Sequence, residues 1–355
     1  MMRLGKTLVL GMLLAGCGGA PAASAPATSS APAKATASTS ASLAAKPAAS
    51  GQLIKVTAAY PNISGSNIPI FITAEGGYFR RNGLDADLQF INGAAKSTGA
   101  LLANQVEICH CGGSEAVNVN TANGDLVVTA VLTPVYPYKF MAAPDIKTFN
   151  DLKGKPIGIS SIGGAVDVVT RLVLRKNGLD PDKDVILVPD NGSTFRIDAL
   201  LGGATKAAMA DPPGLMKLEE KGFHAIANPA AEKIPTANSG VLAQRSWLNT
   251  HRDVMQHYVD ALIEGTARAK RDKAFAVSAM KKYFKSDDDA TMSGTYDFFV
   301  NDVETLEPLV KPDQFTDSIN ELAKQNPGVK NYDISKAIDN SFVQSAIERG
   351  LAKQI

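Results

Sequence analysis

The stretch Arg81-Asn-Gly-Leu-Asp85 decides the fold, because the same pattern returns later as Lys176-Asn-Gly-Leu-Asp180. A second pair follows it, since Ala100-Leu-Leu-Ala-Asn104 recurs as Ala199-Leu-Leu-Gly-Gly203. The two recurrences have nearly equal offsets of 95 and 99 residues. Similarity at a constant offset is typical of a duplicated supersecondary unit. The sequence therefore predicts two lobes of like topology.

Each repeat has the pattern of alternating strands and helices. We expect strands at residues 55–60, 87–91, 106–111, 156–159, 185–188 and 207–210. We expect helices at residues 68–81, 94–103, 114–122, 165–176, 193–201 and 214–221. Asn82-Gly83 and Asn177-Gly178 supply the left-handed residue that ends a helix. Strands alternating with helices across short loops predict an α/β fold built on parallel sheets.

The pattern changes after residue 222. One more strand is expected at residues 239–244, followed by helices within residues 246–285, 290–303, 314–323 and 335–351. If these helices pack on the first lobe, the chain crosses between the lobes twice, near residues 141–145 and 238–241. Two crossings make a hinge. We expect lobe 1 to comprise residues 53–142 and 241–355, and lobe 2 residues 143–240.

The first 52 residues are expected to lie outside the fold. Residues 1–17 have a basic start and an apolar run, which is typical of a signal peptide. Leu14-Ala15-Gly16-Cys17 resembles the lipobox of bacterial lipoproteins, and this resemblance implies that Cys17 carries the lipid that holds the protein to the cell membrane. Residues 18–52 are rich in Ala, Pro, Ser and Thr. They are expected to form a tether with a reach of about 30 Å.

The composition argues against a nucleic-acid partner. The 355 residues carry a formal net charge of +1, and 45% of them are hydrophobic. A near-neutral chain offers no electrostatic attraction for a polyanion.

The loops at the carboxyl ends of the strands are the expected ligand site, as in other open α/β sheets. We expect ligand contacts from Tyr60, Asn62, Ser64, Ser66, Gly113, Ser114, Ser160, Ser161, Gly163, Gly164 and Asp211. The Ser160 to Gly164 loop opens a helix and is suited to an anionic or carbonyl group. Asp211 is suited to a cationic or hydroxylated group. Ordinary capping stays open as the alternative for each serine and for Asp211.

The cluster Cys109-His110-Cys111 falls on an expected strand. The two cysteines would share one face about 6.6 Å apart, with His110 on the other. That spacing is too wide for a disulfide, and a zinc site would lack ligands. We therefore expect two buried free thiols. We expect no metal, no cofactor and no catalytic residue.

Residues 53–355 resemble the periplasmic solute-binding proteins of ABC importers, in the nitrate/sulfonate/taurine group that also includes binders of thiamine-pyrimidine precursors. The resemblance lies in Ala74-Glu-Gly-Gly-Tyr-Phe79, Asn82-Gly-Leu-Asp85, Ile146-Lys-Thr-Phe-Asn-Asp-Leu-Lys-Gly-Lys155 with Ile157-Gly-Ile159, and Asn177-Gly-Leu-Asp-Pro181 with Ala199-Leu-Leu-Gly-Gly203.

This resemblance implies a two-lobed periplasmic-binding-protein fold of type II-like topology with two hinge crossings. It implies a monomer outside the cytoplasm that closes on a small solute and passes it to an ABC permease and ATPase. Two alternatives stay open. One is an enzyme like the thiamine-pyrimidine synthases, and the other is a sensory or adhesion lipoprotein on the same fold.

Overall fold

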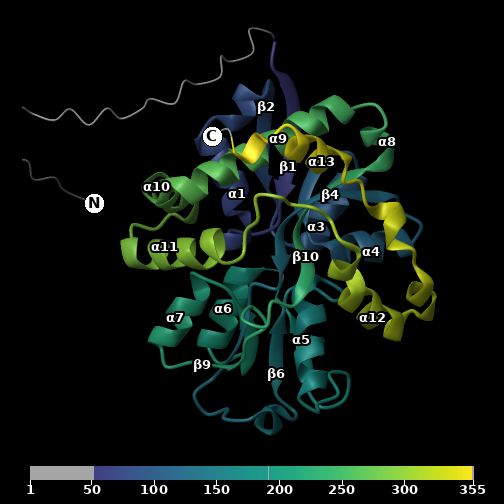
Figure 1. Cartoon of the computed structure of the whole chain (residues 1–355). Coiled ribbons are helices and arrows are strands. Elements are labelled where there is room, and N and C mark those ends of the chain that lie inside the picture. Colours follow the sequence, from purple (N-terminus) through teal and green to yellow (C-terminus); the bar gives the residue numbers. More distant parts are fainter. Residues whose placement is uncertain (1–51, 191, 354–355) are drawn as a thin grey trace, which may run out of the picture. The chain divides into compact units, whose positions relative to one another are not determined.

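The computed structural model describes residues 52–190 and 192–353. The expected signal peptide, the expected lipid-bearing Cys17 and nearly all of the expected tether lie outside these residues. The described part contains two five-stranded sheets surrounded by helices (Figure 1). The α/β class predicted from the repeats is confirmed.

The first sheet has the strand order β2-β1-β3-β10-β4. Its strands are β1 (Ile54–Tyr60), β2 (Leu84–Phe90), β3 (Ile108–Cys111), β4 (Leu126–Val135) and β10 (Pro235–Gln244). Strand β1 runs parallel to β2 and β3, whereas β10 runs antiparallel to β3 and β4.

The second sheet has the equivalent order β7-β6-β8-β5-β9. Its strands are β5 (Lys139–Ala142), β6 (Pro156–Ile159), β7 (Ile186–Pro189), β8 (Ala207–Ala210) and β9 (His224–Ala227). Strand β6 runs parallel to β7 and β8, and β5 runs antiparallel to β8 and β9. In each sheet the antiparallel strand is the one that enters from the other lobe. The two sheets therefore repeat one topology, as the sequence repeats predict.

The helices cover both sheets. They are α1 (Ile68–Glu75), α2 (Tyr78–Arg81), α3 (Ala94–Leu102), α4 (Gly113–Thr121), α5 (Ala165–Lys176), α6 (Ser193–Leu201), α7 (Gly214–Glu220), α8 (Arg245–Leu248), α9 (Arg252–Arg271), α10 (Lys273–Phe284), α11 (Asp289–Tyr296), α12 (Thr316–Gln325) and α13 (Ser341–Glu348). The helix expected at residues 68–81 is interrupted, because Gly77 adopts a left-handed φ of 69° between α1 and α2.

The two crossings between the sheets lie earlier in the chain than the sequence suggested. They are residues 136–138, between β4 and β5, and residues 228–234, between β9 and β10. The boundary expected at residue 142 assigned β5 to the first lobe, but β5 pairs with β8 and β9 of the second sheet. The crossings run side by side, because the pairing of β4 with β10 extends to Val135 and Pro235.

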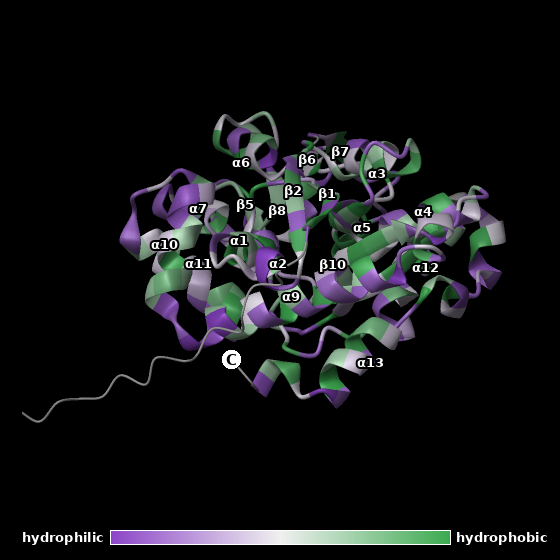
Figure 2. Cartoon of the chain, turned by 90° about the horizontal axis from the view of Figure 1, so that it is seen from above, coloured by the Kyte–Doolittle hydropathy of each residue, from purple (hydrophilic) through white to green (hydrophobic). Residues whose placement is uncertain are grey.

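Apolar side chains fill the space between each sheet and its helices. One large cluster joins β1 to α1, α9 and α13, and a separate cluster packs β5 and β6 against α5. Figure 2 shows apolar residues (green) on the strands and hydrophilic ones (purple) on turns of the outer helices. In the described part of the chain, no helix combines the length and the apolar character that crossing a membrane requires.

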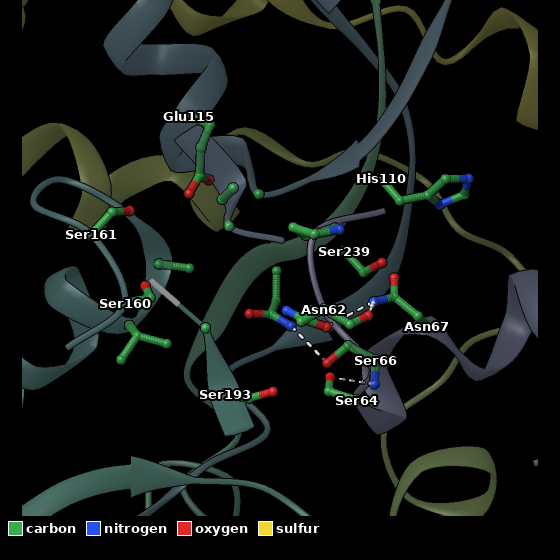
Figure 3. Close-up of a pocket in the computed structure, with 18 of the residues that line it drawn as sticks. Asn62, Ser64, Ser66, Asn67, His110, Glu115, Ser160, Ser161, Ser193 and Ser239 are labelled. Atoms are coloured by element: carbon green, nitrogen blue, oxygen red, sulfur yellow. Dashed lines mark hydrogen bonds between the residues drawn. The ribbon is translucent and has the colours of Figure 1, made fainter. Parts of the chain in front are cut away.

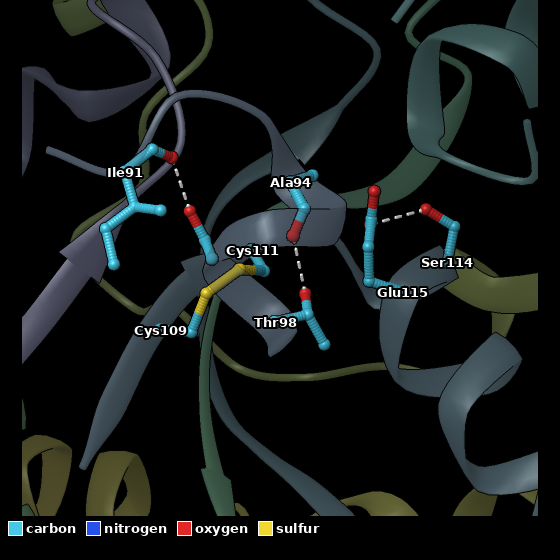
Figure 4. Close-up of a disulfide and its surroundings, with 8 residues drawn as sticks. Ile91, Ala94, Thr98, Cys109, Cys111, Ser114 and Glu115 are labelled. Carbon is cyan, nitrogen blue, oxygen red and sulfur yellow. Dashed lines mark hydrogen bonds between the residues drawn. A yellow bond between two sulfur atoms is a disulfide. The ribbon is translucent and has the colours of Figure 1, made fainter. Parts of the chain in front are cut away.

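The expectation of two free thiols on β3 is wrong. Cys109 and Cys111 form a disulfide (Figure 4). Their Cα atoms are 5.4 Å apart. This is shorter than the fully extended spacing assumed from the sequence, and it falls within the range that a disulfide spans. Both residues are buried, and His110 lies on the opposite face of the strand, as predicted, where it contacts Tyr258.

Candidate functional site

A polar cavity of about 80 Å³ lies between the two lobes. Its walls come from the loops that follow β1, β2, β3, β6, β7 and β8, together with Tyr138 of the first crossing and Asn238 and Ser239 of β10. The lining residues include Asn62, Ser64, Ser66, Asn67, Asn92, Lys96, His110, Gly112, Glu115, Tyr138, Ser160, Ser161, Ser193, Arg196, Asp211, Asn238 and Ser239. This is the position at which open α/β sheets bind ligands.

The first-lobe wall is a hydrogen-bonded loop after β1. The Asn67 side chain donates to the backbone oxygen and the side-chain oxygen of Asn62, at 2.9 and 2.8 Å. The Ser66 amide donates to Ser64 Oγ, and Asn238 Nδ2 donates to Ser66 Oγ at 3.0 Å. Figure 3 shows this loop on one side of the cavity, with Ser160 and Ser161 on the other. These bonds fix the polar groups of the loop before any solute arrives.

The amino terminus of α5, expected to suit an anion or a carbonyl, already faces two carboxylates of the protein. The Gly163 amide donates to Asp167 Oδ2 at 2.8 Å, and Arg171 holds the same carboxylate. The Ala165 amide donates to the carboxylate of Glu115, which comes from α4 in the other lobe. This helix end is therefore occupied by negative charge from the chain itself.

Glu115 links the lobes across the cavity. Its side chain accepts hydrogen bonds from Ser114 and Ala165, while the residue is only 9% exposed. Burial raises the pKa of Glu115, and these hydrogen bonds oppose the rise.

One guanidinium and two carboxylates lie together on the second-lobe wall. Arg196 is 2% exposed, donates from Nε to the Met209 carbonyl at 2.7 Å, and lies 3.9 Å from Asp190. Burial raises the pKa of Asp190 and of Asp211 to about 6, although Arg196 attracts both carboxylates. Desolvation therefore outweighs the nearby positive charge at both positions.

His110 lines the cavity as a neutral ring. Its Nε2 lies 2.7 Å from the Tyr258 hydroxyl, and burial lowers the pKa of His110 to about 3. A buried imidazole with so low a pKa carries no charge at neutral pH.

The structure brings six of the eleven expected contact residues to the cavity wall, namely Asn62, Ser64, Ser66, Ser160, Ser161 and Asp211. Gly163 and Gly164 line a neighbouring cavity of about 180 Å³ at the start of α5.

The other three expected residues pack elsewhere. The Tyr60 ring contacts Phe71 and Phe90. A Cβ at Gly113 would lie 2.4 Å from the Phe315 ring, so this glycine serves packing. The Ser114 hydroxyl donates to Glu115 at 2.8 Å.

Several lining residues were not expected from the sequence, chiefly Asn92, Glu115 and Asn238. Glu115 directly follows a Gly-Gly-Ser loop at a helix start, which is a signal that could have identified it. Asn92 directly follows the strand expected at residues 87–91, and this position could have identified it. Asn238 lies within β10 and carries no such signal. Among the described residues, no group of three or more His, Cys, Asp or Glu side chains is arranged to hold a metal ion.

Comparison with known proteins agrees with this arrangement. Residues 65–274, more than half of the chain, match the family model described as "NMT1/THI5 like". Over 242 residues the chain is 25% identical to "Putative binding protein YtlA" of Bacillus subtilis (strain 168), an alignment that covers 66% of this chain and 72% of that protein.

Two solved structures with a similar fold are a binding protein and an enzyme. The alkanesulfonate-binding protein SsuA from Xanthomonas axonopodis pv. citri, bound to MOPS, superposes with a TM-score of 0.67 at 14% identity, over 82% of this chain and all of that one. The desulfurization enzyme DSZB superposes with a TM-score of 0.60 at 14% identity, over 83% and 99%. These likenesses confirm the predicted periplasmic-binding-protein fold, which serves both binding and catalysis.

Proposed function

The chain belongs to the NMT1/THI5-like family, and from this we propose that it is a solute-binding protein that captures a small molecule between its lobes and delivers it to an ABC importer. The partners in this proposal are a permease and an ATPase. The solutes considered are nitrate, sulfonates, taurine and thiamine-pyrimidine precursors. The protein is proposed to act as a monomer.

The observation that carries the proposal is the composite cavity. Both lobes line it, its surface is rich in hydroxyl and amide groups, and it lies at the carboxyl ends of the parallel strands of both sheets. A site built from two lobes is completed only when they come together, so a solute that contacts both lobes stabilises the closed arrangement.

Contacts around the cavity support closure as the mechanism. Asn238 connects Ser66 to Tyr138, since it donates to Ser66 and accepts from the Tyr138 hydroxyl at 2.9 Å. On the far side of the cavity, Arg175 of α5 lies 3.4 Å from Glu321 of α12. We propose that the two sheets with their helices move as bodies about residues 136–138 and 228–234.

The location belongs to the same proposal. A lipid on Cys17 would hold the protein on the outer face of a membrane, and residues 18–52 would let the folded part move above it. Tethering beside the permease raises the local concentration of the binding protein.

Native mass spectrometry of the freshly purified full chain tests the proposal, combined with thermal-shift titration of the candidate solutes. We expect a bound small molecule or a rise in melting temperature with at least one solute. Asn92→Ala should weaken that effect because Asn92 lines the cavity, and Asn331→Ala, on the surface away from it, should leave it unchanged. A protein that carries no small molecule and responds to no solute would contradict the proposal.

The enzymatic alternative receives less support from the cavity. Nucleophilic catalysis by cysteine needs a free thiol beside a base. The two cysteines nearest the cavity form a disulfide, and His110 is bonded to Tyr258. We therefore favour binding.

A further inference from the structure

A second cavity, of about 480 Å³, adjoins the first and is more open to solvent. It lies between α6 and α7 of the second lobe and the end of α10 with the loop that follows it. Its lining includes Ile63, Ser64, Ser193, Ile197, Asp198, Asp211, Pro212, Pro213, Lys217, Glu220, Phe284 and Asp288. Ser64, Ser193 and Asp211 line both cavities and form the boundary between them.

Asp211 is a buried carboxylate at this boundary. It is 5% exposed, it receives a hydrogen bond from Ser64, and its Oδ2 atom has no hydrogen-bond partner among the described residues. A carboxylate oxygen that is buried without a partner is costly. Because both cavities reach Asp211, a bound molecule in either of them can supply the missing donor.

The walls around Asp211 are negative. Asp198, Asp211, Glu220 and Asp288 line the second cavity. Lys217, the one cationic residue among the described residues that line it, lies 3.6 Å from Asp198. In the first cavity, Arg196 is held by Met209 and Asp190, and Lys96 is exposed. Within the part of the chain that the structure describes, Asp211 therefore has no direct ion pair, and its pKa of about 6 leaves it mostly ionised at neutral pH.

The opposite wall offers little to an anion. The Gly163 and Ala165 amides at the start of α5 already donate to Asp167 and Glu115. An anionic solute in the first cavity would have to displace one of these carboxylates or lie beside it. Like charges at such short range in a buried site are strongly unfavourable.

Apolar side chains complete the second cavity. Ile63, Ile197 and Phe284 line it together with Pro212 and Pro213. A flat apolar body fits such a surface, and a charged head at Asp211 would fix its orientation.

We propose that the solute is a small organic cation, with an ammonium or amidinium head at Asp211 and an apolar body in the second cavity. This inference rests on the proposed function and replaces its anionic candidates, nitrate and the sulfonates, with a cation. It separates this chain from the structurally similar alkanesulfonate-binding protein SsuA.

Three probes of similar shape test the inference on the full chain purified in mild detergent: benzamidine, its neutral analogue benzamide, and benzenesulfonate. Calorimetric titration should give benzamidine at least about tenfold tighter binding than benzamide, because only the amidinium pairs with a buried carboxylate. Benzenesulfonate should bind most weakly. Asp211→Asn should lower benzamidine affinity at least about tenfold and remove its advantage over benzamide.

Two further variants serve as controls. Glu220→Gln removes one exposed charge of the second cavity and should weaken benzamidine binding only about twofold, because exposed charges are screened. Asp87→Asn, on the exposed side of β2, should change nothing. Near-UV circular dichroism checks that each variant is folded.

The outcomes of these experiments distinguish failure of the inferred cation class from failure of the proposed function. If benzenesulfonate binds best, or if Asp211→Asn binds benzamidine as the wild type does, the inferred cation class is overturned while solute binding stands. If no probe binds, the molecule found by native mass spectrometry tests the inferred cation class. A bound cation supports the inference, and a bound anion or neutral solute overturns it. If neither probes nor a native solute bind, the proposed function falls as well.

Discussion

The burial of Asp211 predicts that Asp211→Asn stabilises the ligand-free protein above pH 6. The Asp211 carboxylate is almost fully buried, and one of its oxygens has no partner among the described residues. The amide of asparagine has nearly the same shape and can still accept from Ser64, but it carries no charge that must be desolvated.

The sign follows from the proton balance. The folded protein binds the Asp211 proton more tightly than the unfolded chain does, since burial raises the pKa from 3.8 to about 6. Stability of the wild type therefore falls as the pH rises through this window. A rise of this size corresponds to about 3 kcal/mol at 25 °C. The attraction of Arg196 is already contained in that pKa, so it does not reverse the sign.

Urea denaturation followed by circular dichroism at pH 4 and pH 8 measures the effect. The wild type and Asp211→Asn should have nearly equal unfolding free energies at pH 4. At pH 8 the variant should be more stable by up to about 3 kcal/mol. A variant that is less stable than the wild type at pH 8, or a difference that does not change with pH, would refute the reasoning. Asp87→Asn, denatured at the same two pH values, serves as the control. It measures how the loss of an exposed carboxylate changes the unfolding free energy.

Three other outcomes follow from the structure. Gly65→Ala should lower the unfolding free energy by about 1–3 kcal/mol in denaturation experiments, because its Cβ would lie 2.0 Å from the Phe299 ring. When the unfolded, unreduced protein is alkylated, mass spectrometry should show Cys109 and Cys111 without the alkyl label. After prior reduction, both cysteines should carry it. The ring resonances of His110 should not shift between pH 5 and 8 in NMR spectra, because burial lowers its pKa to about 3. A His110 titration near pH 6.5 would contradict its burial.

Local signals in the sequence predicted most of the fold. Gly83 and Gly178 both adopt the left-handed φ of 80° expected of residues that end a helix, and they mark equivalent points in the two lobes. The strands at residues 156–159 and 207–210 were predicted to the residue. These features depend on neighbours along the chain, and for that reason a single sequence shows them.

Features that depend on distant partners were not predicted. Strand β5 was assigned to the wrong lobe because its four residues are identified only by pairing with β8 and β9. The disulfide was excluded because the sequence gives the ideal strand spacing and not the shorter Cα distance at Cys109 and Cys111. The contact of Glu115 with Ala165 joins residues of different lobes. No local pattern encodes such a contact.

The same contact bears on how the chain selects its solute. A helix amino terminus in an open cleft attracts whatever negative group can reach it, and here Glu115 and Asp167 are the groups that do so. When the lobes meet, the protein itself thus supplies the anion that a sulfonate or nitrate would otherwise provide. Among the described residues that line the cleft, Asp211 Oδ2 lacks a hydrogen-bond partner, and so do His110 Nδ1 and Ser239 Oγ of the first lobe. A solute that brings hydrogen-bond donors can bond Asp211 Oδ2, whereas a solute acceptor placed at the start of α5 must first displace Glu115 or Asp167.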